Sequence, residues 1–212
     1  SGTQLTTGFV GTPYLCHVLT RFGHVELAYR LLERREYPSW LYPVIRGATT
    51  IWEHWDGIKP DGSFWSDDMN SYNHYAYGAV GDWLFGSAAG IDADEAEPGY
   101  RRIRLRPLPG GSLTFAEATL DSPYGEIRSA WTRSEDGRSI VYEVTVPANA
   151  SADVRLAGAK LADVTESGAR LENAEGVSDA KETAEGLAFR LGSGVYRFEA
   201  STAAPANVGA EA

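Results

Sequence analysis

The stretch Ala93-Asp-Glu-Ala-Glu-Pro-Gly-Tyr100, followed by Arg101-Arg-Ile-Arg-Leu-Arg106, marks the place where the chain changes its pattern. Pro98-Gly99 favours a turn, because proline fixes φ and glycine accepts conformations that other residues avoid. Beyond this turn apolar and charged residues alternate, which is the period of a half-buried strand. We therefore expect one domain over residues 1–95, a second over residues 96–200 and a disordered tail over residues 201–212.

The part before residue 95 is predicted to be mainly helical. Thr12-Pro13 has the form of an N-cap followed by a proline at the first helical position, and Gly23 ends that helix. Tyr37-Pro38 closes a second helix, whose apolar residues at helical spacing are Val25, Ala28, Leu31 and Leu32. A further helix is predicted from Ser71 to Ala89, with Gly90 as its stop.

The part after residue 95 is predicted to consist of strands. Segments with alternating apolar and polar residues are Arg101–Arg106, Leu113–Leu120, Glu126–Thr132, Ser139–Val146, Ala152–Leu156 and Val195–Glu199. Residues 166–185 are low in apolar content and are expected to form a long hairpin or loop. Strands at this spacing without intervening helices indicate an antiparallel β-sandwich. The predicted fold class is therefore α+β, with an N-terminal α-helical segment before the sandwich.

The composition excludes several classes of partner. A net charge of −10 argues against nucleic acid and against docking on anionic lipid. No apolar run approaches the ~20 residues of a membrane-spanning helix. The single cysteine, Cys16, excludes an internal disulfide framework, and we expect neither a metal nor a cofactor. The chain begins with Ser1 rather than Met, so we expect it to be a piece of a longer protein, and its sequence does not indicate a compartment.

The clearest candidate for chemistry is Gly47-Ala-Thr-Thr-Ile-Trp-Glu-His-Trp-Asp56, which is followed by Ser71-Tyr-Asn-His-Tyr75. The first stretch holds one carboxylate, Glu53, between two tryptophans, Trp52 and Trp55. Indole rings offer flat apolar surfaces to the faces of a sugar ring, and a carboxylate can exchange protons at the reacting carbon. These residues predict a sugar-binding site.

His74 follows Glu53 in the second stretch, at the head of the helix predicted from Ser71. The dipole of that helix would oppose a charged imidazole, so we expect a neutral ring that forms hydrogen bonds with sugar hydroxyls. The alternative is a histidine with a purely structural role.

Glu53 also has a structural alternative. Thr50-Ile-Trp-Glu53 fits a capping box, in which a glutamate reaches back to the start of a helix. Periodicity alone leaves capping and catalysis about even, and the surrounding tryptophans favour catalysis, because partial burial shifts a carboxyl pKa. Asp56, three residues after Glu53, would either tune the neighbouring carboxylate or end the helix, and both interpretations stay open.

Four motifs in a fixed order extend this pattern. They are Thr7-Gly-Phe-Val-Gly-Thr-Pro13, Glu36-Tyr-Pro-Ser-Trp40, Gly47-Ala-Thr-Thr-Ile-Trp-Glu53 and Asn73-His-Tyr-Ala-Tyr-Gly-Ala-Val-Gly81. Together they resemble the C-terminal part of the bacterial α-L-rhamnosidases, which are multidomain glycoside hydrolases with an (α/α)6 catalytic barrel followed by a β-sandwich. The resemblance implies that the helical segment is the last part of such a barrel.

The resemblance also implies roles for single residues. Glu53 matches the general base that activates water in an inverting hydrolysis of terminal α-L-rhamnose, and His74 matches a histidine that contacts the rhamnose. Trp52 and Trp55 match the aromatic residues that flank the base, and they are assigned to substrate binding. The general acid of the family is a glutamate in an earlier motif, which this chain lacks. The fragment alone is therefore expected to be inactive.

A complete (α/α)6 barrel contains six helix pairs, whereas residues 1–95 have room for about four or five helices. The missing helices would leave an apolar face bare, so we expect the remainder of the polypeptide or self-association to cover it. Two alternatives remain for the function. One is another inverting (α/α)6 hydrolase that acts on a different sugar, and the other is a non-catalytic sugar-binding or interaction module.

Overall fold

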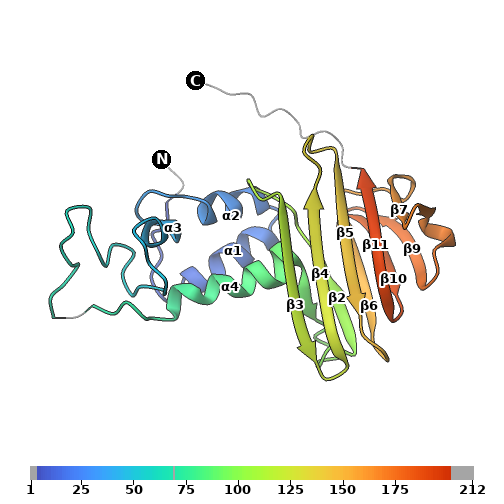
Figure 1. Ribbon diagram of the computed structural model, residues 1–212, viewed down its shortest axis with the longest axis horizontal. Helices are drawn as coiled ribbons and strands as arrows, with labels where there is room; N and C mark the ends of the chain where they lie inside the picture. Colours follow the sequence, from blue (N-terminus) through green and yellow to red (C-terminus); the bar gives the residue numbers. More distant parts are fainter. Residues whose placement is uncertain (1–3, 69, 202–212) are drawn as a thin grey trace. The chain divides into compact units, whose positions relative to one another are not determined.

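The computed structural model describes residues 4–68 and 70–201 (Figure 1). These residues form two compact units. The first, here called the helical unit, comprises the residues up to Leu84 together with Gly110–Ser112. The second, the sheet unit, comprises Phe85–Pro109 and the residues from Leu113 on. The domain limits expected at residues 95 and 200 stay predictions. No helix in the described ranges has the length and apolar character needed to cross a membrane.

Two short helices, α1 (Thr12–Arg21) and α2 (Val25–Leu32), begin the helical unit. The turn between them contains Gly23 at a φ of +81°, a conformation that glycine adopts without strain, so the predicted end of the first helix is confirmed. The predicted cap is wrong, because Thr12 is already the first residue of α1. The Thr12 hydroxyl instead donates to the carbonyl oxygen of Thr7 at 3.0 Å, which fixes the chain that enters the helix.

The second helix ends at Leu32, well before the predicted stop at Tyr37-Pro38. Residues 33–36 are all charged, so a longer helix would have no apolar side to bury. Glu33 accepts hydrogen bonds from the backbone N–H and the hydroxyl of Ser112 at 2.7 and 3.0 Å. A single helical turn, α3 (Leu41–Val44), follows.

The third predicted helix starts later than expected. Helical turns run over η1 (Ala76–Ala79), α4 (Val80–Trp83) and η2 (Leu84–Ala89) rather than from Ser71. Residues 71–74 stay outside the helix because two of them form backbone hydrogen bonds with residues 51 and 53. The predicted stop at Gly90 is confirmed, because its φ is +91° and a Cβ there would lie 2.3 Å from the nitrogen of Pro107.

Two sheets make up the sheet unit (Figure 1). One has the strand order β1-β2-β6-β10-β9, and the other has the order β3-β4-β5-β11-β7-β8. Neighbouring strands are antiparallel, apart from the parallel pair β2 and β6. The strands are β1 (Ile91–Ala93), β2 (Arg102–Leu105), β3 (Phe115–Ser122), β4 (Gly125–Arg133), β5 (Ser139–Val146), β6 (Ser151–Ala157), β7 (Val164–Glu166), β8 (Ala169–Arg170), β9 (Val177–Thr183), β10 (Gly186–Leu191) and β11 (Gly194–Ser201).

The core of the sheet unit is apolar, with a few polar groups that are satisfied internally. Trp131 is 1% exposed, and its indole N–H donates to the carbonyl oxygen of Ala88 at 2.7 Å. The hydroxyl of Ser129 donates to the carbonyl oxygen of Ala89 and lies 3.0 Å from the hydroxyl of Tyr142. Burial raises the pKa of Tyr142 well above its ordinary value. These bonds fix the start of the sheet unit to its core. The helices before residue 90 and the two sheets after it confirm the predicted helical segment plus β-sandwich.

The six predicted strands are all present, with ends that move by at most two residues. Residues 166–185 are not a loop, because they contain β8 and β9. The strand β9 lies at the margin of its sheet and buries none of its side chains fully, so its sequence lacks the usual alternation. The strands β1, β7 and β10 were also not predicted. Of the tail expected over residues 201–212, residues 202–212 lie outside the described residues. Ser201 is the last residue of β11.

Candidate active site

Two irregular segments of the helical unit, residues 50–53 and 71–74, are held side by side by hydrogen bonds. The N–H of Glu53 donates to the carbonyl oxygen of Ser71 at 2.9 Å, and the N–H of His74 donates to the carbonyl oxygen of Ile51 at 2.8 Å. The Thr50 hydroxyl donates to the carbonyl oxygen of Tyr72. This arrangement, here called the ladder, brings the segments of Glu53 and His74 together although the residues between them form a loop.

The ladder also fixes the carboxylate of Glu53. Its Oε2 accepts the backbone N–H of Ser71 at 3.1 Å, and the side chain is half-buried. The capping box is therefore wrong, because no helix starts at Thr50 and the glutamate reaches across the ladder instead of back to Thr50. Asp56 loses its predicted helical relation to Glu53 for the same reason. Within the described chain, no hydrogen bond is formed to Glu53 Oε1.

His74 lies two residues before η1 and forms a hydrogen bond with the first residue of that helix. Its Nδ1 accepts the backbone N–H of Ala76 at 3.3 Å. Because Nδ1 accepts this hydrogen bond, Nε2 is the ring nitrogen left to donate to a ligand. The ring is half-buried and stacks on Phe9 and Tyr75, with centroid distances of 4.8 and 5.4 Å. These contacts leave Nε2–H as the donor that His74 can offer to a ligand.

The two tryptophans that flank Glu53 lie in the interior of the helical unit. Trp52 is 5% exposed and packs edge-on against Tyr72, and Trp55 is 9% exposed and stacks on Tyr77 at 3.7 Å. The cavity that both tryptophans line has a volume of about 30 Å³. Ligand pockets measure roughly 300–1,000 Å³, so this space does not hold a sugar. Contact of either ring with substrate stays a prediction, and what the structure shows is two rings that fix the backbone around Glu53.

A cluster around Gly57 closes the loop between the two segments of the ladder, and no local sequence pattern predicts it. The carbonyl oxygen of Gly57 accepts hydrogen bonds from the side-chain amide of Asn70 at 3.1 Å and from the hydroxyl of Tyr72 at 3.0 Å. A Cβ on Gly57 would lie 3.2 Å from both Trp52 and Tyr72. Within the loop, Trp65 stacks on His54 at 3.6 Å and is 44% exposed.

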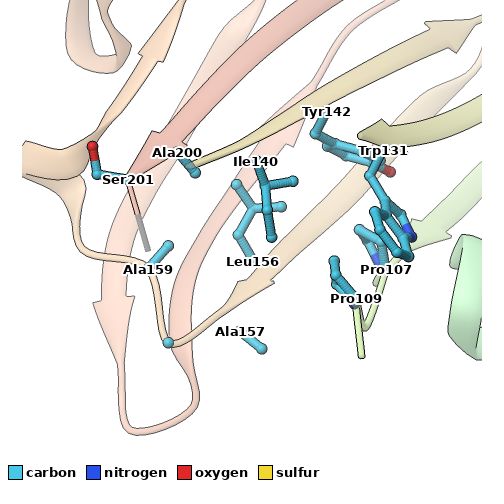
Figure 2. A pocket seen from close by; sticks show the side chains of 11 residues that line it. Pro107, Pro109, Trp131, Ile140, Tyr142, Leu156, Ala157, Ala159, Ala200 and Ser201 are labelled. Atoms are coloured by element: carbon cyan, nitrogen blue, oxygen red, sulfur yellow. The ribbon is translucent and has the colours of Figure 1, made fainter. Parts of the chain in front are cut away.

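The sheet unit contains a separate apolar cavity of about 260 Å³ (Figure 2). Figure 2 shows Ile140 and Leu156 at its centre, with Trp131, Pro107 and Pro109 on one side. Among the described residues that line it there is no carboxylate or histidine, so they supply none of the groups that exchange protons in hydrolysis. The residues suited to acid–base chemistry are those of the ladder.

Comparison with known proteins places the chain in a family. Residues 1–88 match the family model of the bacterial alpha-L-rhamnosidase 6 hairpin glycosidase domain, and residues 90–170 match that of the bacterial alpha-L-rhamnosidase C-terminal domain. An alpha-L-rhamnosidase of Streptomyces avermitilis is 49% identical over 151 residues, which are 71% of this chain and 14% of the relative. One from Formosa agariphila is 44% identical over 153 residues, which are 72% of this chain and 16% of the relative.

Solved structures show the same relationship. The Streptomyces avermitilis alpha-L-rhamnosidase complexed with L-rhamnose matches with a TM-score of 0.83 and 40% identity, over 94% of this chain and 18% of that structure. The alpha-L-rhamnosidase from Dictyoglumus thermophilum matches with a TM-score of 0.80 and 32% identity, over 94% and 21%. The chain thus spans about a seventh of the length of these curated relatives. It belongs to the bacterial α-L-rhamnosidase family, of which it carries part of the six-hairpin glycosidase domain and the C-terminal domain.

Proposed function

We propose that this chain is part of an α-L-rhamnosidase that releases terminal α-L-rhamnose with inversion, and that Glu53 is its general base. The observation that carries the proposal is the asymmetric environment of the Glu53 carboxylate. Its Oε2 is anchored by the N–H of Ser71, while Oε1 has no hydrogen bond within the described chain. A general base needs one oxygen held in position and one that faces the attacking water.

His74 would hold the sugar next to this base. Its Nδ1 accepts the N–H of Ala76, so Nε2 is the nitrogen that would donate a hydrogen bond to a sugar hydroxyl. The ladder supports this role, because it joins the segments of Glu53 and His74 through two backbone hydrogen bonds of 2.8 and 2.9 Å. Base and sugar contact would therefore keep a fixed relation during turnover.

The general acid lies outside this chain in the proposed mechanism. An inverting hydrolase needs a second carboxyl group roughly 6.5–9.5 Å from the base, so that water fits between them. Asp56, the carboxylate nearest to Glu53 in the sequence, belongs to no motif that suits protonation of a leaving oxygen. This chain alone is then expected to bind poorly and to lack activity.

The remainder of the polypeptide, or a second copy, would complete the site. On and after α1, three large apolar residues recur at helical spacing and are exposed, namely Tyr14 at 66%, Val18 at 48% and Phe22 at 71%. Such a ridge, with residues four apart, is the surface that another helix packs against. The exposed ridge supports a helical partner rather than open solvent on this side of α1.

The test uses the full-length protein that contains this chain. It should hydrolyse p-nitrophenyl α-L-rhamnoside and leave the fucoside and glucoside analogues nearly untouched, and proton NMR should show β-L-rhamnose as the first product. Preference for another glycoside would favour a different inverting hydrolase on the same barrel. Absence of hydrolysis together with rhamnoside binding by the 212-residue chain would favour the non-catalytic module.

A further inference from the structure

The outer face of the sheet β1-β2-β6-β10-β9 carries an open hollow of about 510 Å³. Five cationic side chains line it, namely Arg102, Arg106, Arg155, Lys181 and Arg190. Of the described residues, two carboxylates line it, Asp153 and Asp179, so these side chains give a positive local charge in a chain whose net charge is −10. We call this site the cationic hollow.

Strand register explains how the hollow forms. On β2, Ile103 and Leu105 are fully buried, so the arginines that alternate with them lie on the outer face. On the neighbouring strands Ala188 is paired with Arg155 on one side and with Lys181 on the other. Because the side chain of Ala188 is small, it leaves space between the long side chains of Arg155 and Lys181.

Several of these cations are already neutralised. Asp153 accepts from Arg102 at 2.7 Å and from Arg190 at 3.2 Å. Asp179 lies 3.4 Å from Arg190, and Arg155 is bonded to Glu185. Among the described residues, no carboxylate lies within 4.0 Å of Arg106 or Lys181. The excess positive charge is thus concentrated at the part of the hollow around Arg106.

Like Lys181, Arg106 has no carboxylate within 4.0 Å among the described residues, and it is the more buried of the two. Burial lowers the pKa of Arg106, and the neighbouring charges of Arg155 and Arg104 lower it further, while the more weakly acting Glu185 and Asp92 offset part of this effect. A guanidinium does not lose its proton at neutral pH, so the unfavourable interaction persists in the folded protein. A bound anion would offset both the burial and the repulsion.

We propose that the cationic hollow binds a carboxylate-bearing saccharide, with Arg106 as its main anion contact. The planar fork of arginine matches the two oxygens of a carboxylate. A volume of about 510 Å³ lies in the range of roughly 300–1,000 Å³ for ligand pockets, and it exceeds the needs of a small inorganic ion. The saccharide nature rests on the proposed function, whereas the preference for an anion rests on the charges alone.

The test is calorimetric titration of the full-length protein at low salt with trigalacturonate, and with its methyl ester as an uncharged probe of the same shape. We expect binding of the acid, and little or none of the ester. Arg106→Gln should weaken binding of the acid about tenfold or more. Arg138→Gln removes the same charge from an exposed hairpin turn and should leave binding unchanged. Lys181→Gln is a second, exposed test variant should Arg106→Gln fail to fold.

Four results would overturn the proposal. Equal binding of the methyl ester would exclude charge recognition, and wild-type affinity of Arg106→Gln would exclude this site. Inorganic sulfate binding as tightly as trigalacturonate would show an adventitious ion only. Preferred binding of galactose 6-sulfate would assign the hollow to sulfate esters instead of carboxylates. Hydrolysis of p-nitrophenyl α-L-rhamnoside, measured on the same samples, should be unchanged in Arg106→Gln, so failure of this site is distinguishable from failure of the proposed function.

Discussion

Replacement of Glu53 by Gln separates the chemistry of the candidate site from its architecture. Glutamine has nearly the same shape, and its carbonyl oxygen can accept the N–H of Ser71 that now donates to Glu53 Oε2 at 3.1 Å. The ladder should therefore persist, because its other hydrogen bonds are independent of this side chain. The variant loses only the ability to take a proton from water. General-base catalysis is worth ~10²–10⁴-fold, which corresponds to about 2.7–5.4 kcal/mol of activation free energy.

The assay is hydrolysis of p-nitrophenyl α-L-rhamnoside by the full-length protein, with thermal unfolding measured in parallel. We expect kcat to fall ~10²–10⁴-fold while the free energy of unfolding stays within about 0.5 kcal/mol. Glu53→Asp is the matched control, because it keeps the charge but withdraws the carboxylate from Ser71 by one methylene. The kcat of Glu53→Asp should lie between that of the wild type and that of Glu53→Gln. A kcat within tenfold of wild type for Glu53→Gln would refute the assignment of Glu53 as base.

Three further predictions concern single residues. His74→Ala should mainly raise KM for rhamnosides, and an unchanged KM would argue for the structural alternative. Ser129→Ala should lower the free energy of unfolding, measured in urea, by about 1–3 kcal/mol, because the buried oxygens of Tyr142 and Ala89 lose their hydrogen-bond partner. The double variant Ser129→Ala/Tyr142→Phe should lose less free energy of unfolding than the two single variants added together. Burial raises the pKa of the Cys16 thiol to about 11, so iodoacetamide should label this thiol at pH 8 only in the unfolded protein. The free energy of unfolding should also fall as pH rises from about 9 to about 11, because the unfolded chain releases the thiol proton at a lower pH than the folded protein does.

The sequence predicted best where a regular pattern faces a core. Ser139–Val146 was predicted with its observed ends, because alternate residues such as Tyr142, Val144 and Val146 are buried there. The sequence did not predict β9, because this strand lies at the margin of its sheet and its residues do not alternate between buried and exposed positions. It also failed for residues 71–74, where helical periodicity continued but hydrogen bonds to a segment twenty residues earlier prevailed.

The residues of the candidate site stay predictions from the sequence, and their geometry was not predictable from it. The aromatic setting of Glu53 pointed to a carboxylate of interest, yet the same sequence also fitted a capping box, and only long-range contacts excluded it. Nothing in the local pattern placed Ser71 against Glu53 or Asn70 against Gly57. The roles of Trp52 and Trp55 were drawn from neighbourhood in sequence, while their burial depends on Tyr72 and Tyr77.

The closed loop between the two segments of the ladder has a consequence for how the protein can change. Gly57 and Asn70 join the two ends of the loop, and the ladder lies outside them. Insertions or exchanges between these residues would therefore leave Glu53 and His74 in place, since lengthening a loop adds little to the entropy of closing it. The segment between Gly57 and Asn70 is therefore the natural place to graft loops between relatives while the positions of Glu53 and His74 stay fixed.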